Sequence, residues 1–222
     1  LLFATLAREA GIQARVQEVG QVVSWYQDQD QGVVYSVGHV NAGVGFAGRF
    51  ATVDLDRNVL YDRRGPLPIS QARALAHFYN NRGAERMASG DLAGARTFFD
   101  TALAQDGSFA ATWNNLGVLE NRTGDTAAAR RALERALRLD GRQDAALTNA
   151  SALYRKLGMI AQAQALEQRL QSVQREDPFA QYMLGAEAER AGQLQQAIRY
   201  YRQAVRLYDT AHQFHFGLAR VY

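Results

Sequence analysis

The apolar positions of this 222-residue chain follow two different patterns, and the change between them falls near residue 70. Before it, apolar side chains alternate with polar ones or run in short blocks, which is typical of β-strands. After it, they recur every three or four residues, which is typical of amphipathic helices. The first part therefore predicts a short helix and several strands, and the second part predicts helices alone.

Turn residues set the limits of the N-terminal elements. We expect a helix over residues 1–10 that stops at Gly11, followed by strands over residues 12–19, 22–26, 33–46 and 50–55. The polar run 27–32 predicts a loop, and the glycines within 45–48 predict a tight turn. Two prolines within 63–68 predict a linker, after which Ser70 caps the first long helix.

The helical part repeats with a period of 34 residues. Within residues 110–143, a helix with Trp113 and Leu116 on one face stops at a glycine, and a second helix carries Ala129 and Leu133. That glycine recurs at every period, as Gly90, Gly124, Gly158 and Gly192. A fixed period of this length indicates stacked helical hairpins, because one hairpin cannot bury its apolar face alone.

This pattern resembles the tetratricopeptide repeat, a helix–turn–helix unit, with repeats starting at residues 76, 110, 144 and 178 and a half repeat at 212. The resemblance implies a mainly α fold, an α-solenoid over residues 76–222 that follows a small α+β part over residues 1–65, with 66–75 as linker and helix start. Small residues at Gly117 and Ala129 would let the two helices of a repeat approach closely. The open half repeat predicts that further chain covers it, or that copies of the chain associate there.

In tetratricopeptide arrays, the first helix of each repeat lines a groove that holds a peptide or a partner protein. The resemblance assigns the fifth groove position to Asn80, Asn114, Thr148, Tyr182 and Phe216, and the second, twelfth and thirteenth positions to Phe179, Arg155, Arg122, Lys156 and Arg190. These residue types predict a groove that runs from polar to aromatic with a basic side, suited to an acidic and apolar segment. The alternative is that further helices cover the aromatic residues and that the basic residues are only solvated.

The N-terminal part carries a second resemblance. The helix ending LAREAGI, His39 on one predicted strand and Asp54 on the next are similar to the second half of a transglutaminase-like domain of the papain-like cysteine peptidase superfamily. In that family a thiolate attacks a carbonyl, a histidine holds the proton and an aspartate orients the imidazole. The resemblance gives the last two roles to His39 and Asp54. Asp56, two residues further on the same face, is an alternative to Asp54.

The spacing of the predicted hairpin agrees with this assignment. If residues 45–48 form an even-length turn, paired residues sum to 93, and His39 stands directly opposite Asp54. The nucleophile of the family has no match, because the chain contains no cysteine. It would precede Leu1 in the same helix, so either the chain starts after it or the domain is a remnant.

Two functions therefore stay open. One is a protein-interaction scaffold attached to a transglutaminase-like domain, and the other is a cysteine-dependent acyl-transfer enzyme or peptidase whose repeats present the substrate. The pairing of the two resemblances is typical of exported bacterial proteins, which predicts the periplasm or cell envelope, with the cytoplasm as the alternative.

Composition narrows the remaining possibilities. No run of 18 apolar residues exists, so we expect no transmembrane segment. The net charge of +3 gives no reason to expect nucleic acid as a partner, and no cofactor is expected. His212 and His215 lack a third ligand, and Asp28 and Asp30 lack the spacing of a calcium loop, so no metal site is expected either.

Overall fold

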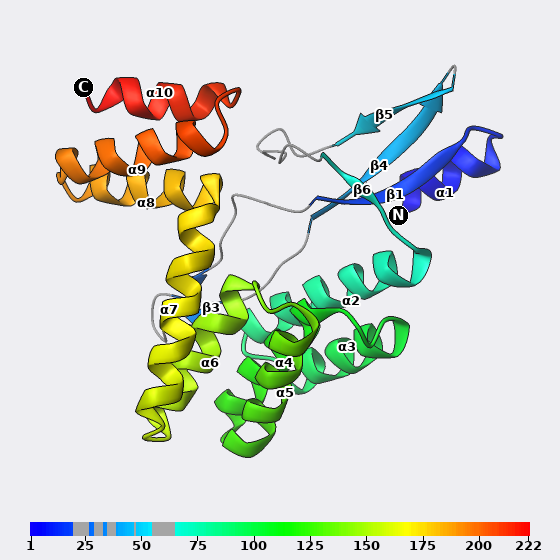
Figure 1. Ribbon diagram of the computed structural model, residues 1–222. Coiled ribbons are helices and arrows are strands. Elements are labelled where there is room, and N and C mark those ends of the chain that lie inside the picture. Colours follow the sequence, from blue (N-terminus) through cyan, green and yellow to red (C-terminus); the bar gives the residue numbers. More distant parts are fainter. Residues whose placement is uncertain (20–26, 29–32, 35–38, 47, 55–64) are drawn as a thin grey trace. The chain divides into compact units, whose positions relative to one another are not determined.

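The computed structural model describes residues 1–19, 27–28, 33–34, 39–46, 48–54 and 65–222 (Figure 1). The chain forms two compact units, Leu1–Gln164 and Ala165–Tyr222, and the boundary between them falls inside helix α7 (Ile160–Glu176). The first unit contains a small sheet and the first helical repeats. The second unit contains the later helices.

The sheet of the first unit has four antiparallel strands in the order β5-β4-β1-β6. These are β1 (Ala14–Val19), β4 (His39–Phe46), β5 (Arg49–Val53) and β6 (Leu67–Pro68). Helix α1 (Leu2–Glu9) buries Ala4 and Ala7 and contacts β1 and β4. Ala4 packs in one apolar cluster with Val16, Ala42 and Ala74, which joins the helix to the sheet.

Several N-terminal predictions need correction. The predicted strand 33–46 is two strands, β3 (Val33–Val34) and β4, and β3 pairs with β2 (Gln27–Asp28) inside the predicted polar loop. The predicted linker contributes strand β6, whose Leu67 and Pro68 pair with β1. A proline is tolerated there because an edge strand bonds to one neighbour only. The predicted strand 22–26, Asp30 and Asp56 lie outside the described residues.

The hairpin between β4 and β5 differs from its predicted register. Phe46 pairs with Arg49 and Ala42 with Val53, so paired residues sum to 95 rather than 93. The turn is thus one residue further along the chain, and Gly48 takes a positive φ of 75° that favours glycine. Each residue of β4 therefore faces a residue of β5 that lies two positions further along the chain than predicted. Because side chains alternate between the two faces of a sheet with a period of two, the observed partner lies on the same face as the predicted one.

Polar contacts join the sheet to the first repeat. The imidazole of His77 is only 1% exposed, and its Nε2 atom lies 2.9 Å from the Oε1 atom of Glu18 on β1. Burial alone would raise the pKa of Glu18, but the hydrogen bond from His77 and its charge outweigh that effect and hold the pKa below 4.5. The backbone amide of Ile69 also donates to the carbonyl of Val16 at 3.0 Å. These contacts explain why the sheet and the first repeats share one unit.

The helices follow in antiparallel pairs, which confirms the mainly helical array preceded by a small sheet. The pairs are α2 (Gln71–Ala88) with α3 (Leu92–Gln105), α4 (Ala110–Thr123) with α5 (Thr126–Leu139), and α8 (Pro178–Arg190) with α9 (Leu194–Leu207). Helices α6 (Asp144–Lys156) and α7 follow α5 along the chain, and α10 (His212–Arg220) follows α9. Gly124, with φ of 92°, ends α4 in the left-handed conformation, and the equivalent glycines of the other repeats do the same. The side chain of Asp125 then caps α5 by accepting from the amide of Ala128 at 2.8 Å.

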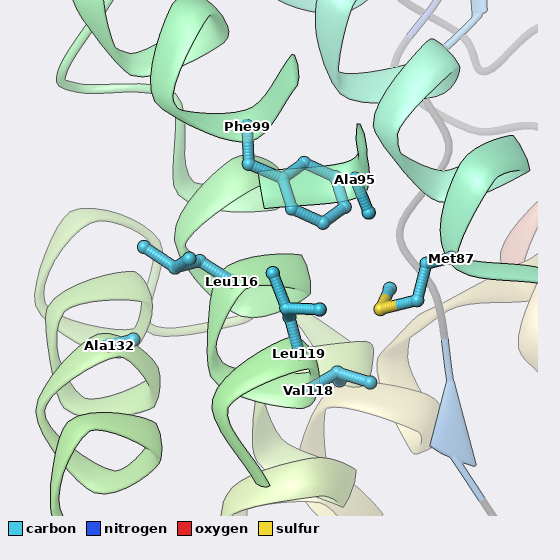
Figure 2. Packing of buried hydrophobic residues seen from close by; sticks show 7 residues of the cluster. All are labelled: Met87, Ala95, Phe99, Leu116, Val118, Leu119 and Ala132. Carbon is cyan, nitrogen blue, oxygen red and sulfur yellow. The ribbon is translucent and has the colours of Figure 1, made fainter. Parts of the chain in front are cut away.

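The cores of three repeats depend on glycine at one position of the first helix, where the third repeat has Ser151. A Cβ atom at Gly83 would stand 2.4 Å from the ring of Phe99, and one at Gly117 would stand 2.6 Å from the Cγ atom of Leu133. The predicted close approach of the two helices is therefore confirmed. Figure 2 shows the core around Phe99, which lies among apolar side chains from four helices, Met87, Ala95, Leu116, Val118, Leu119 and Ala132.

The second unit has its own core, centred on the fully buried Tyr201. The phenol of Tyr201 donates to the carboxylate of Glu189 at 2.7 Å, and Arg220 makes a bidentate pair with the same carboxylate at 2.5 Å. The hydrogen bonds from Arg220 hold the pKa of Glu189 below 4.5, and burial together with that carboxylate raises the pKa of Tyr201.

Within the described part of the chain, no helix is both long and apolar enough to cross a bilayer.

Candidate functional site

The predicted histidine and aspartate of the N-terminal part meet in the sheet. The Nε2 atom of His39 on β4 lies 3.0 and 2.9 Å from the two carboxylate oxygens of Asp54, which follows β5. Asn41 donates from its Nδ2 atom to Oδ2 of Asp54 at 3.0 Å. The side chains of His39 and Asp54 are 20% and 11% exposed, so the pair is partly shielded from water.

The register explains how three side chains converge. Continuing the pairing beyond Ala42 and Val53 places Asn41 directly opposite Asp54, and His39 reaches the carboxylate along the diagonal. The sequence prediction named His39 and Asp54 but missed Asn41. The signal that could have found it is the alternation along β4, because Asn41 lies on the same face as His39 two residues later.

This cluster can orient an imidazole. With Nε2 protonated, His39 donates to Asp54, and the carboxylate fixes the tautomer that leaves Nδ1 able to exchange a proton. The arrangement thus supplies a base and its orienting group, and Asn41 steadies the carboxylate. It supplies no thiol, because the chain has no cysteine.

The predicted groove asparagines have a different environment from the one expected. Asn80 and Asn114 are fully buried, and each accepts a hydrogen bond from the next repeat. Asn115 donates to Asn80 at 3.0 Å and Asn149 donates to Asn114 at 2.9 Å, both across 35 residues. Asn80 also donates to the side chain of Asn81 at 3.3 Å. We call these five residues the asparagine ladder. It corrects the expectation that Asn80 and Asn114 face an open groove, since stacking places them between adjacent first helices.

The ladder joins the fifth position of one repeat to the sixth position of the next. Asn80 and Asn114 are fifth positions, and Asn115 and Asn149 are sixth positions. The next contact of this kind would join Thr148, the fifth position of the third repeat, to Met183, the sixth position of the fourth repeat. Thr148 is half-buried, and a methionine side chain cannot donate a hydrogen bond. The sequence of the ladder therefore stops at the third repeat, the repeat whose second helix contains the boundary between the two units.

The predicted basic positions of the first unit lie at the C-terminal ends of the first helices. Arg122 donates to the carbonyl of Met87 at 3.2 Å, and Lys156 donates to the side chain of Asn121 at 3.2 Å, again across 35 residues. Arg155 and Lys156 are both exposed. The last turns of successive first helices therefore present basic side chains, where they also complement the helix dipole.

The remaining predicted groove residues belong to the second unit. Phe179 is 6% exposed and packs edge-on against Phe214, and Tyr182 stacks on the same ring at 5.1 Å between centroids. Phe216 is 66% exposed. Arg190 is exposed and donates to the carbonyl of Ala186 in its own helix at 3.4 Å. Phe179 is therefore a core residue here, because the half repeat α10 covers it.

A pocket of about 350 Å³ lies between α4 and α5. Its lining is apolar at the floor and charged at the rim, and consists of Trp113, Leu116, Glu120, Ala128, Arg131, Ala132, Arg135 and Arg138. The sequence placed Trp113 and Leu116 in the repeat but assigned no binding site to this region. The signal for it is the spacing of three arginines by four and three residues, which places them on one side of a helix.

No described set of three or more histidine, aspartate and glutamate side chains is arranged to hold a metal ion. The Nε2 atom of His215 instead lies 2.7 Å from the backbone carbonyl oxygen of Asp209.

Paired helices that stack with a constant period define the class of this chain as a helical repeat protein. Residues 80–144 and residues 178–211 each match the tetratricopeptide repeat family, so these two stretches of the array are tetratricopeptide repeats. No curated protein matches the chain by sequence.

Solved structures of similar fold come from several proteins. PilF of Pseudomonas aeruginosa is 18% identical over 68% of this chain and 69% of its own, with a TM-score of 0.46. The second tetratricopeptide domain of Spaghetti (RPAP3), bound to an HSP90 peptide, is 19% identical over 46% of this chain and 95% of its own, with a TM-score of 0.44. MamA of Desulfovibrio magneticus RS-1 is 18% identical over 68% of this chain and 84% of its own, with a TM-score of 0.42.

Proposed function

We propose that the repeat array is a scaffold that binds a peptide or an extended segment of a partner protein. The observation that carries the proposal is the asparagine ladder, which holds three successive first helices in one register through hydrogen bonds of 2.9 and 3.0 Å. A surface made of helices in constant register can present the same side-chain position repeatedly to a linear ligand. A preorganised surface of this kind also loses little conformational entropy on binding.

The chemistry of the ligand follows from the basic residues in the last turns of the first helices. Arg155 and Lys156, in the last turn of α6, are exposed, and Arg122, in the last turn of α4, is half-buried. Carboxylates of a bound segment would pair with these side chains, which gives specificity and a fast association rate more than affinity. We therefore expect an acidic segment, and we expect its binding to weaken as the salt concentration rises.

A direct test uses a fluorescein-labelled acidic peptide, Glu-Glu-Gly-Glu-Glu, and fluorescence anisotropy at low and physiological salt. The double variant Arg155→Glu, Lys156→Glu should bind it at least tenfold more weakly than the native chain. The control Arg169→Glu, Arg199→Glu changes the charge by the same amount at two exposed arginines elsewhere. Equal binding by the native chain and the double variant would sink the assignment of these residues.

A second candidate function rests on the cluster of His39, Asn41 and Asp54. We propose that the N-terminal sheet is the C-terminal part of a transglutaminase-like domain in which His39 is the base and Asp54 orients it. The support is the contact of 2.9 Å between Nε2 of His39 and the carboxylate, together with the second hydrogen bond from Asn41. Because the 222 residues contain no cysteine, a thiol from outside them would have to act as the nucleophile.

The test of this second function is hydroxamate formation from a glutamine-containing peptide and hydroxylamine. Turnover by the full gene product that is lost in His39→Ala, and strongly reduced in Asp54→Ala, would support it. The sheet must remain folded in both variants, which circular dichroism checks. Turnover at background level, or turnover that His39→Ala leaves intact, would reject an enzymatic role for the cluster.

A further inference from the structure

The pocket between α4 and α5 lies on the side of α4 that faces away from the proposed peptide surface. A helix turns by about 100° per residue, so Trp113, Leu116 and Glu120 follow one side of α4. Asn114 of the ladder and Arg122, the basic residue in the last turn of α4, lie on the opposite side. The pocket is therefore a separate surface of the same repeat.

The floor of the pocket is apolar, and the side chains that form it are held by contacts with their neighbours. Leu116 and Ala132 are 8% and 4% exposed, and Trp113 is half-buried. The indole Nε1 of Trp113 donates to the carbonyl of Gly107 at 2.9 Å, which holds the ring at the mouth of the pocket. A volume of about 350 Å³ is enough for one large side chain of a ligand.

The rim has an excess of positive charge. Arg131, Arg135 and Arg138 are exposed, and no ion pair with another described residue is formed by any of them. Glu120, the acidic residue of the lining, is already paired with Arg96 at 2.7 Å. Seven residues of helix span about 10 Å, which is the length of about three residues of extended chain.

We propose that this pocket binds an acidic peptide segment that carries one aromatic or large aliphatic side chain. That side chain lies on Trp113, Leu116 and Ala132, and carboxylates before and after it pair with the three arginines. Guanidinium groups suit this role because they form bidentate hydrogen bonds with carboxylates and lose little hydration on pairing. The inference goes beyond the proposed function, since it adds a second peptide site on the opposite side of α4.

The experiment measures anisotropy of the labelled peptide Glu-Glu-Phe-Glu-Glu with the full chain carrying Arg155→Glu, Lys156→Glu, so that the surface of the proposed function does not contribute to binding. In that chain the added triple variant Arg131→Glu, Arg135→Glu, Arg138→Glu should bind the peptide at least tenfold more weakly. Its matched control, Arg169→Glu, Arg199→Glu, Arg206→Glu, carries the same charge change at exposed arginines outside the pocket and should bind within twofold of the chain without it.

A second pair of variants tests the floor without changing charge. Ala128→Phe fills the pocket and should weaken binding at least tenfold, whereas Ala127→Phe, at an exposed neighbour that does not line it, should not. A peptide with glycine in place of phenylalanine should also bind at least tenfold more weakly than the labelled peptide.

Each other result overturns the inference. If the control triple variant weakens binding as much as the pocket variant, the attraction is one of general charge. If the glycine peptide binds as well as the phenylalanine peptide, the apolar floor has no role in binding. If inorganic phosphate displaces the labelled peptide as effectively as unlabelled peptide does, the occupant of the pocket is a small anion. If the native chain binds Glu-Glu-Phe-Glu-Glu but the chain with Arg155→Glu, Lys156→Glu does not bind it at all, the proposed function stands and this second site does not.

Discussion

Replacing Asn115 with alanine tests the asparagine ladder most directly. Asn115 is fully buried, donates to Oδ1 of Asn80 at 3.0 Å and accepts from Nδ2 of Asn114 at 3.1 Å. The substitution removes both bonds and leaves two buried polar atoms without those partners, at about 1–2 kcal/mol each. Alanine regains about 0.5 kcal/mol through its higher helix propensity. We therefore expect the free energy of unfolding to fall by about 2–3 kcal/mol.

Urea denaturation followed by tryptophan fluorescence measures this effect. With a denaturant slope of about 2 kcal/mol per molar, the midpoint should fall by about 1–1.5 M. The matched control is Asn121→Ala on the same helix, whose exposed hydrogen bond with Lys156 is 3.2 Å long. It should change the free energy of unfolding by less than about 0.5 kcal/mol.

A double-mutant cycle then isolates the bond between repeats. Asn80→Ala and Asn115→Ala remove the two ends of one hydrogen bond, so their effects should be non-additive by about 0.5–1 kcal/mol or more. Additivity within about 0.3 kcal/mol, or a midpoint for Asn115→Ala equal to that of the Asn121→Ala control, would refute the claim that the ladder couples adjacent repeats.

Two further predictions concern the cores of the units. Gly117→Ala should lower the free energy of unfolding by about 1–3 kcal/mol, because its Cβ would stand 2.6 Å from Leu133. The control Gly107→Ala, whose Cβ would only touch a backbone oxygen at 3.5 Å, should not lower it. Thermal denaturation compares the two variants, and equal stabilities would contradict the packing argument. The hydrogen bonds from Arg220 lower the pKa of Glu189 in the folded chain, so the stabilisation from this pair is full above the usual pKa of a glutamate and is lost as the pH falls through the lowered pKa. The melting temperature of the native chain should therefore approach that of Glu189→Gln on acidification, and a constant difference down to about pH 2 would contradict this reading.

The helical array was predictable because its signals are local and repeated. Gly124 and its equivalents end helices in a backbone conformation that other residues adopt at a cost, so the period shows directly in the sequence. The pairing of His39 with Asp54 was also within reach of the sequence, although its predicted register was wrong. Alternation with a period of two preserves the face when the register moves by two residues, so the two side chains still meet.

The environments of other residues required neighbours that are distant in the sequence. Asn80 has the residue type and position of a groove residue, yet its burial depends on Asn115 of the next repeat, 35 residues away. Pro68 indicates a linker from local chemistry alone, and becomes a strand residue only because the edge of β1 lies beside it. Neither outcome can be read from local periodicity.

The amino-acid sequence by itself determined the repeat, its period, the ends of its helices and the residue types available for chemistry, because backbone preference and hydrophobic spacing act within a few residues. Only the tertiary structure decided that asparagines bond between repeats, that Asn41 joins His39 and Asp54, and that three arginines surround an apolar pocket beside Trp113. The physical reason is that burial and hydrogen-bond partnership are properties of packed surfaces. Those surfaces form only when separate repeats and strands come together.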